Sequence, residues 1–351
     1  MTGAATEPRL TSLAHGGGCG CKIAPGVLEG ILREAKTAMP LPPGLLVGIE
    51  TSDDAAVYRV NDRQAIVATT DFFMPIVDDP HDFGRIAATN AISDVYAMGG
   101  TPLFALALVG MPVNVLSQAT IGRILDGGAA ACRDAGIPVA GGHSIDSVEP
   151  IYGLVAIGLV DPAHLKRNAD ARPGDALVLG KPLGVGVFSA ALKQQALDAD
   201  GYARLVATAT RLNTPGPELA RLPGVHAMTD VTGFGLAGHA LEMARGSGQR
   251  LRIDWAAVPL LPQARTLAQA GFVTGASGRN WASYGGQVRL ADGFGDLDRA
   301  LLCDPQTSGG LLVACARDAV DEVLDTFRRH GFADAAVVGE VREGEPGLDV
   351  G

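Results

Sequence analysis

Two cysteines and a lysine stand close together in residues 15–22, which read His-Gly-Gly-Gly-Cys-Gly-Cys-Lys. The thiolate is the nucleophilic form of cysteine, and a neighbouring cation such as Lys22 favours it at Cys19 or Cys21. The three preceding glycines leave the backbone mobile wherever no special angle is required. The segment therefore predicts a flexible arm that carries a reactive sulfur and a positive charge.

Two other interpretations of this segment are a disordered terminus with incidental cysteines and half of a Cys-x-Cys metal site. A structural zinc site needs four ligands, commonly supplied as two pairs. The remaining cysteines are isolated from one another in the sequence (Cys132, Cys303 and Cys315). Because the sequence offers no second pair, the reactive arm is the favoured interpretation.

Several aspartates occupy positions where a soluble fold seldom places a charge. They are Asp53 and Asp54 before an expected strand at 55–60, Asp71 after a strand at 65–70, Asp94 inside an apolar helix at 83–98, and Asp230 at the end of a strand at 227–230. Carboxylates gathered at strand ends repel one another unless a cation lies among them, and oxygen ligands select hard cations such as Mg²⁺. A helix cap or a turn explains any single one, Asp53 most readily. The group as a whole predicts a metal that bridges to phosphates.

Glycine-rich turns complement these carboxylates. Residues 140–144 follow an expected strand at 138–140, which Gly141 and Gly142 would end, and bare amides there could cradle phosphate oxygens. Residues 180–186 and 307–310 are similar in kind. The first of these is not a Walker A loop, because its lysine precedes the second glycine and no Lys-Ser/Thr pair closes it. A tight turn without a ligand is the alternative for each.

The elements that position these residues alternate along the chain. The expected strands lie at 55–60, 65–70, 103–109, 138–140, 151–160, 176–179 and 311–315, and the expected helices at 26–37, 83–98, 117–135, 201–213, 235–246 and 318–330. This alternation predicts an α/β or α+β fold. A polar, proline-bearing interval at 161–175 indicates a domain boundary. We therefore expect an arm at 1–47 and two domains at 48–162 and 173–351.

Composition narrows the possible functions. The net charge is 28 − 38 = −10 with no basic block, which disfavours nucleic acid as a partner. Residues 1–14 lack the apolar stretch of a signal peptide, and the apolar runs near 102–113 and 151–160 are too short to span a bilayer. Five cysteines give no secretory disulfide framework. We expect a cytoplasmic protein with no membrane partner.

Together these motifs resemble the selenophosphate synthetase (selenide, water dikinase) family of the aminoimidazole ribonucleotide synthetase superfamily. The matching stretches are 10–25, 51–58, 69–77, 83–94, 140–146, 228–236 and 301–310. The resemblance implies a two-domain α/β fold with a flexible glycine-rich N-terminal arm. It also implies a homodimer formed through the N-terminal domains, with ATP bound near the interface. The implied reaction converts ATP, selenide and water into selenophosphate, AMP and phosphate.

The resemblance further implies a role for individual residues. The catalytic residues would be Cys19 and Lys22, and the magnesium ligands Asp54, Asp94 and Asp230. The nucleotide contacts would be Lys22, Thr51, Ser52, Asp53, Asp71, Asp94, Gly142, His143 and Ser144. Mg²⁺ is the expected cofactor, and a monovalent cation such as K⁺ is a further candidate.

Two rival functions remain at this stage. One is another ATP-dependent small-molecule kinase or ligase of the same superfamily, such as thiamine monophosphate kinase, which does not need the Cys-Gly-Cys-Lys arm. The other is a non-catalytic protein that delivers selenium to a partner, against which the intact aspartates and Lys22 argue. The sequence leaves open which pathway would use the selenophosphate.

Overall fold

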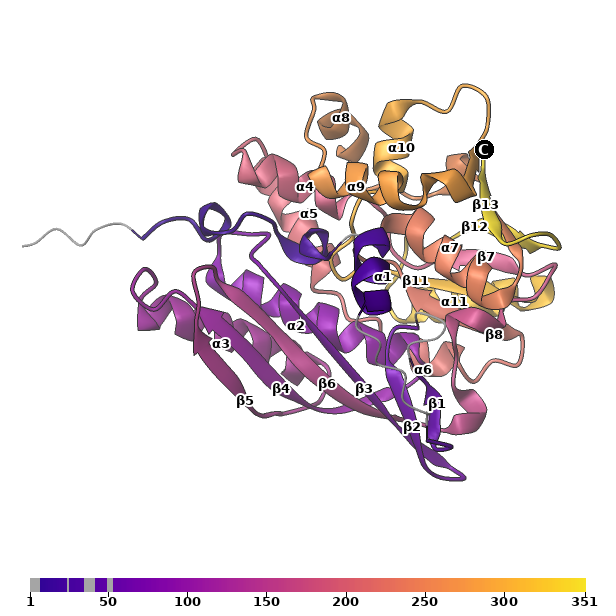
Figure 1. The fold of residues 1–351 in the computed structure, drawn as a ribbon, viewed down its shortest axis with the longest axis horizontal. Helices are drawn as coiled ribbons and strands as arrows, with labels where there is room; N and C mark the ends of the chain where they lie inside the picture. The colour runs from indigo at the N-terminus through magenta and orange to yellow at the C-terminus, as the bar shows by residue number, and fades with distance from the viewer. Residues whose placement is uncertain (1–6, 24, 35–41, 49–52) are drawn as a thin grey trace, which may run out of the picture.

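The computed structural model describes residues 7–23, 25–34, 42–48 and 53–351, and it contains two β-sheets with helices packed against them (Figure 1). This arrangement confirms the α/β class expected from the sequence. Two of the predicted nucleotide contacts, Thr51 and Ser52, lie outside the described residues.

The first sheet has six strands in the order β1-β2-β3-β6-β4-β5. Its strands are β1 (Leu45–Val47), β2 (Ala56–Asn61), β3 (Gln64–Phe73), β4 (Thr101–Met111), β5 (Val139–Asp146) and β6 (Ile151–Val160). Only β4 and β5 pair in parallel, and β5 forms one edge. Strands β2, β3, β4 and β6 match the expected strands closely, because each has a run of β-branched or apolar residues bounded by turn residues, whereas β1 was not expected.

Two helices, α2 (Pro80–Ala97) and α3 (Gln118–Asp134), cover the inner face of this sheet. Helix α2 begins where Asp79 accepts a hydrogen bond from the backbone of Asp82, with Pro80 at its first position. Most of its length is buried, because it also touches strand β8 of the second sheet. Helix α2 therefore lies at the junction of the two halves of the chain.

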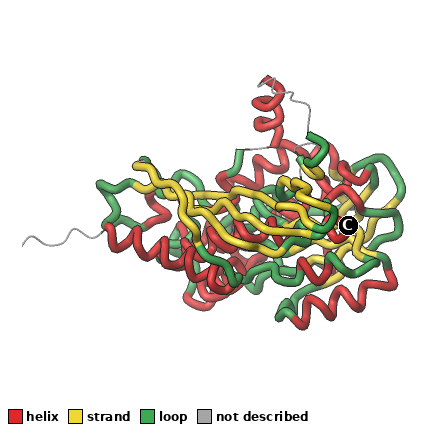
Figure 2. Tube along the Cα trace, turned by 90° about the horizontal axis from the view of Figure 1, so that it is seen from below, coloured by secondary structure: helices red, strands yellow, loops and turns green. Residues whose placement is uncertain are grey.

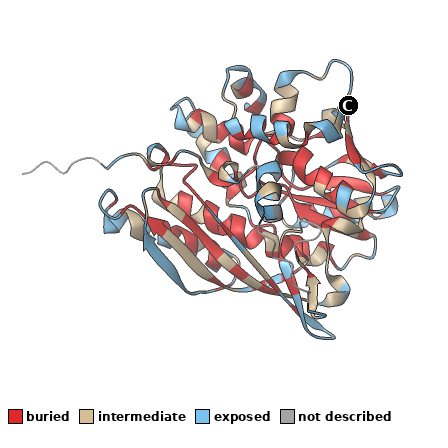
Figure 3. Cartoon of the chain, viewed as in Figure 1, coloured by how far each residue is buried: buried red, intermediate tan, exposed pale blue. Residues whose placement is uncertain are grey.

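The outer face of the first sheet has no helix over it in the described part of the chain, as the view from below shows (Figure 2). Residues alternate between the faces along β3: Phe73 is buried, whereas Phe72 is 51% exposed. Strand β5 is exposed along its whole length (Figure 3). An apolar sheet face beside an exposed edge strand is unusual for a monomer.

The second sheet has seven strands in the order β10-β13-β9-β12-β7-β11-β8. They are β7 (Ala176–Leu179), β8 (Val225–Asp230), β9 (Arg250–Ile253), β10 (Val288–Leu290), β11 (Leu311–Cys315), β12 (Ala336–Arg342) and β13 (Gly347–Val350). The helices of this half are α4 (Val185–Lys193), α5 (Ala199–Ala209), α6 (Gly216–Leu219), α7 (Gly235–Ser247), α8 (Ala264–Gln269), α9 (Gly275–Tyr284), α10 (Asp296–Leu302) and α11 (Val320–Arg329). Leu177 and Leu179 face the cluster that includes α7, whereas Ala176 and Val178 face α11.

Two expected element ends are wrong, because the helix expected at 201–213 ends at Ala209 and the strand expected at 138–140 does not end there. We expected Gly141 and Gly142 to end a strand at 140, but β5 continues through them to Asp146. Gly142 has φ +156°, and a β-carbon there would lie 2.0 Å from the carbonyl oxygen of Ala107 on the paired strand. The glycine permits this close strand pairing and does not mark a phosphate-binding turn.

The N-terminal arm runs along the junction of the two halves. A short 3-10 helix at Leu10–Leu13 and a second at Gly18–Cys21 precede helix α1 (Pro25–Glu34). Arg9 pairs with Asp78 on one side of the junction, and Lys193 donates a hydrogen bond to the carbonyl oxygen of Ala14 from the other. The structure thus shows the arm seated, and its movement stays a prediction.

Candidate active site

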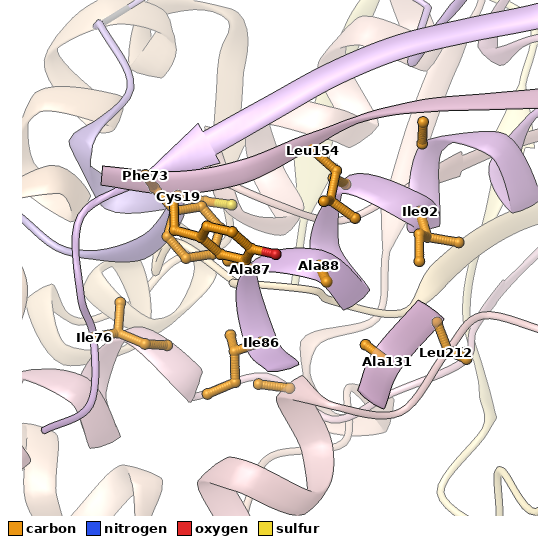
Figure 4. Packing of buried hydrophobic residues seen from close by; sticks show 14 of the residues in the cluster. Cys19, Phe73, Ile76, Ile86, Ala87, Ala88, Ile92, Ala131, Leu154 and Leu212 are labelled. Carbon is orange, nitrogen blue, oxygen red and sulfur yellow. The ribbon is translucent and has the colours of Figure 1, made fainter. Parts of the chain in front are cut away.

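Cys19, a residue of the N-terminal arm, is buried against helix α2. Its side chain is 1% exposed and belongs to the same apolar cluster as Phe73 and Ile76 (Figure 4). The thiol donates a hydrogen bond to Oδ1 of Asn90, with 3.0 Å between the heavy atoms. The backbone amide of Cys19 donates to Oγ1 of Thr307 at 3.1 Å. The arm therefore delivers its first cysteine to a defined place.

Lys22, three residues after Cys19 in the arm, lies near the same residue of helix α2, Asn90. Its ammonium nitrogen lies 3.3 Å from Oδ2 of Asp71, inside strand β3. The same oxygen accepts a hydrogen bond of 2.6 Å from the amide of Asn90. Asp71 raises the pKa of Lys22 well above its usual value, and this attraction outweighs the opposing effect of desolvation. The protonated form of Lys22 is thus favoured both by Asp71 and by contact with solvent, since its side chain is 38% exposed.

Lys22 favours the thiolate of Cys19, as expected from the sequence, but in this seated conformation its effect is outweighed. Burial raises the pKa of the Cys19 thiol well above its usual value, and the negative charge of Asp71 raises it further. Lys22 lowers that pKa by a smaller amount. The physical reason is that burial disfavours the charged thiolate, and Asp71, which pairs with Lys22, adds a negative charge nearby. The pKa of the half-buried Cys21 is also raised, mainly by burial.

The three predicted metal ligands lie where the two sheets meet, and each carboxylate accepts a hydrogen bond from one hydroxyl group. The pairs are Thr229 with Asp54, Thr69 with Asp94, and Ser93 with Asp230. Two of them cross the junction, because Asp54 precedes strand β2 whereas Thr229 and Asp230 end strand β8. Such partners fix the orientation of metal-ligating side chains in known sites.

The carboxylates also interact electrostatically. Burial raises the pKa of Asp54 and of Asp94, and the charge of Asp230 raises both further. Burial is likewise the main cause of the raised pKa of Asp230. The second oxygen of Asp54, Oδ2, is buried without a hydrogen-bond partner among the described residues.

This oxygen-only donor set fits a hard cation, because Mg²⁺ is bound by few carboxylates and completes its shell with water and phosphate oxygens. No group of three His, Cys, Asp or Glu side chains in the described ranges already has the spacing of a metal site. The carboxylates would therefore have to approach one another around the ion.

The other predicted nucleotide contacts lie further away. Asp53 accepts a hydrogen bond of 2.8 Å from the backbone amide of Asn168. Gly142 shares a register row with Asp71, but two strands separate them, which places them about 14 Å apart at the usual strand spacing. His143 lies on the opposite, outer face, in one row with Phe72. The structure does not bring residues 142–144 to the carboxylates within one protomer.

The glycine-rich turn at 180–186 is not an open phosphate cradle. The carboxylate of Asp304 accepts hydrogen bonds from the amides of Gly186 and Val187. The side-chain oxygen of Gln306 accepts from those of Gly184 and Val185. These amides begin helix α4 and are capped by the chain itself.

Sequence reasoning missed the residues that hold the functional groups. Asn90 connects the Cys19 thiol with the Lys22–Asp71 pair, and the one signal that could have found it is its spacing of four from Asp94 on one helix. Thr307 stands in a glycine-rich turn and gave no separate signal. The hydroxyl partners of the carboxylates gave none either.

The chain is similar to known proteins over nearly its whole length. Residues 52–160 match the family described as AIR synthase related protein, N-terminal domain, and residues 172–350 match the corresponding C-terminal domain. A selenide, water dikinase of Burkholderia orbicola (strain MC0-3) is 70% identical over 343 residues, which cover 98% of this chain and 97% of the relative. One of Dechloromonas aromatica (strain RCB) is 68% identical, covering 97% and 98%. The chain belongs to the selenide, water dikinase family.

A solved structure extends the likeness to the fold of the wider superfamily. The thiamine-monophosphate kinase from Stenotrophomonas maltophilia K279a matches with a TM-score of 0.62 and 21% identity, covering 94% of this chain and 96% of that one. At this identity the likeness concerns the fold alone. The described residues include no helix long and apolar enough to cross a membrane.

Proposed function

We propose that this protein is a selenide, water dikinase, which converts ATP, selenide and water into selenophosphate, AMP and phosphate. The observation that carries the proposal is the seating of Cys19 and Lys22 against Asp71 and Asn90 at the junction of the two sheets. The rival kinases of the superfamily do not need a cysteine-bearing arm, and full-length relatives at 68% and 70% identity carry the dikinase name.

Cys19 and Lys22 would act on different substrates, Cys19 on selenide and Lys22 on the phosphates of ATP. Cys19 would handle selenium, a soft nucleophile that an ordinary polar pocket holds poorly, and burial under the arm would exclude water from it. Lys22 keeps its proton because of Asp71 and would stabilise the charge on the transferring phosphoryl group. Phosphoryl transfer depends chiefly on such positioning and charge neutralisation.

Asp54, Asp94 and Asp230 would hold Mg²⁺, since each hydroxyl partner bonds only one of the two carboxylate oxygens. When bound, Mg²⁺ would neutralise phosphate charge and polarise the phosphoryl oxygens. Asp53 and Asp71 would add contacts to the nucleotide, and a monovalent cation such as K⁺ would assist binding. The protein would act in the cytoplasm, where its five free thiols stay reduced.

We also propose a homodimer built on the outer face of the first sheet. That face is apolar and has no cover from the residues that the structure describes, and strand β5 at its edge is exposed throughout. A partner would cover both features. His143 lies on this face, so it would contact a nucleotide across the dimer rather than within its own protomer.

The deciding experiment is anaerobic incubation of the purified protein with ATP, Mg²⁺ and selenide, followed by phosphorus NMR. Selenophosphate, AMP and phosphate in equal amounts would support the proposal. Formation of ADP, or turnover that does not depend on selenide, would refute it.

A further inference from the structure

The turn at 304–310 contacts Cys19 once directly and once through Asn90, yet the mechanism above gives it no role. Oγ1 of Thr307 accepts the hydrogen bond from the amide of Cys19 at 3.1 Å. The amide of Ser308 donates to Oδ1 of Asn90 at 2.7 Å, and this oxygen also accepts from the Cys19 thiol. The turn therefore holds Cys19 directly at its backbone and through Asn90 at its sulfur.

This turn has features that a turn serving only the fold would not need. Ser308 has φ +54°, a left-handed conformation that glycine adopts at lower cost. Its hydroxyl is buried and has no hydrogen-bond partner in the ranges that the structure describes. Behind it the buried Lys181 donates to the carbonyl oxygens of Ser308 and Arg211 at 2.7 and 2.6 Å. Unfavourable features of this kind persist where the surroundings fix them, and they gather at functional sites.

The arm packs closely against the turn at Gly18. Gly18 has φ +53°, and a β-carbon at this position would lie 2.2 Å from Oγ1 of Thr307. The hydroxyl thus enters space that only a glycine leaves open. In this seated arrangement the turn has no free cradle for a phosphate at Ser308, because that amide already binds Asn90.

We propose that Thr307 is a positioning residue for Cys19. Its hydroxyl receives the Cys19 amide when the arm closes and so determines where the thiol stands relative to Asn90 and Lys22. Ser308 and Lys181 keep that hydroxyl in place. The inference rests on the proposed function for its catalytic meaning, whereas its structural part, the closure of the arm over Cys19, is measurable without selenium.

The test compares Thr307→Val, which keeps the shape and loses the hydroxyl, with Thr307→Ser, which keeps the hydroxyl. Thr326→Val is the matched control, since Thr326 is a buried threonine in helix α11 whose hydroxyl bonds only its own helix. All variants carry Cys21→Ser, so that iodoacetamide labelling of the arm peptide, read by mass spectrometry, reports on Cys19 alone. Turnover and the KM for ATP are measured on the same proteins.

We expect Thr307→Val to raise the labelling rate of Cys19 roughly fivefold, the size of one lost net hydrogen bond. It should lower kcat while the KM for ATP stays unchanged. Thr307→Ser should restore both, and Thr326→Val should change neither. If Thr307→Val does not fold, Thr307→Ala carries the same test, because it also lacks the hydroxyl.

Unchanged labelling in the hydroxyl-free variant would overturn the inference, and so would a change confined to the KM for ATP, which would make the turn a nucleotide contact. Failure of the proposed function would be recognised by a different measurement, the formation of selenophosphate. If the reference protein forms no selenophosphate but labelling responds as expected, Thr307 still positions Cys19 in an enzyme of another activity.

Discussion

Lys22 and Asp71 form an ion pair whose atoms Nζ and Oδ2 are 3.3 Å apart, so the cation of the arm meets a carboxylate of strand β3 and not the neighbouring thiol. The side chain of Asn90 donates a hydrogen bond to the carboxylate of Asp71 and accepts one from the thiol of Cys19. The arm thus brings a neutral thiol and a fixed positive charge to the site together. Activation of the sulfur then requires a change in these contacts, which substrates would supply.

The first prediction concerns the thiol. Cys19→Ser should abolish selenide-dependent AMP formation, because a hydroxyl can keep the hydrogen bond to Asn90 but cannot replace sulfur chemistry. ATP binding, measured by calorimetry, should be largely retained, since the carboxylates are untouched. The matched variant Cys21→Ser, two residues away, should do less harm. Wild-type turnover in the Cys19 variant would show that the thiol is not catalytic.

The second prediction concerns the cation. Lys22→Gln should lower kcat by roughly 10²-fold, as expected for the loss of one group that stabilises transition-state charge, with a smaller change in the KM for ATP. Lys193→Gln is the control, because Lys193 also bonds the arm, at the carbonyl of Ala14, but lies away from Asp71. Steady-state kinetics decide the matter. A raised KM with normal kcat would reduce Lys22 to a ground-state contact.

The third prediction concerns the uncovered sheet face. Ile145 is 57% exposed on the outer side of the edge strand β5, and a charge there would be buried in the proposed dimer. Ile145→Lys should therefore give a monomer in light scattering and weaken ATP binding. Val27→Lys is the matched control, since Val27 on helix α1 has the same exposed fraction. A dimer of unchanged mass in the Ile145 variant would place the interface elsewhere.

Local sequence patterns predicted those strands and helices that are defined by the residues inside the element itself. Strands β6, β7 and β11 are continuous apolar runs and were placed at their observed bounds or within a residue. The start of helix α4 was not predictable, because its caps Asp304 and Gln306 come from more than a hundred residues away.

The site divides in the same way. The aspartates and the reactive arm with Cys19, Cys21 and Lys22 were identifiable from residue type and position, and the resemblance added the roles of individual residues. The partners of these residues were not identifiable, because Asn90, Ser93 and Thr307 are ordinary polar residues that acquire a role only when the two sheets meet. The state of the thiol depends on burial and on the competition between Asp71 and Lys22, which spacing along the arm cannot express.

The last prediction concerns the carboxylates. The expected change in melting temperature depends on pH. Burial and the charge of Asp230 raise the pKa of Asp94 in the folded protein above its unfolded value of about 3.9. The unfolding free energy of the metal-free protein should therefore decrease as pH rises from about 4 through the folded pKa. Asp94→Asn keeps an acceptor for Thr69 and removes the charge, so it should raise the melting temperature at pH 8 and have little effect near pH 4.

The same variant should lose most of the stabilisation that Mg-ATP confers, because a ligand stabilises a protein only through its affinity for the folded state. Asp62→Asn, in the exposed turn between β2 and β3, is the control and should leave both quantities unchanged. If Asp94 only supported the fold, its removal would lower the metal-free melting temperature by an amount fitting roughly 1 kcal/mol for one hydrogen bond. The Mg-ATP shift would then survive, and the proposed metal site would be wrong.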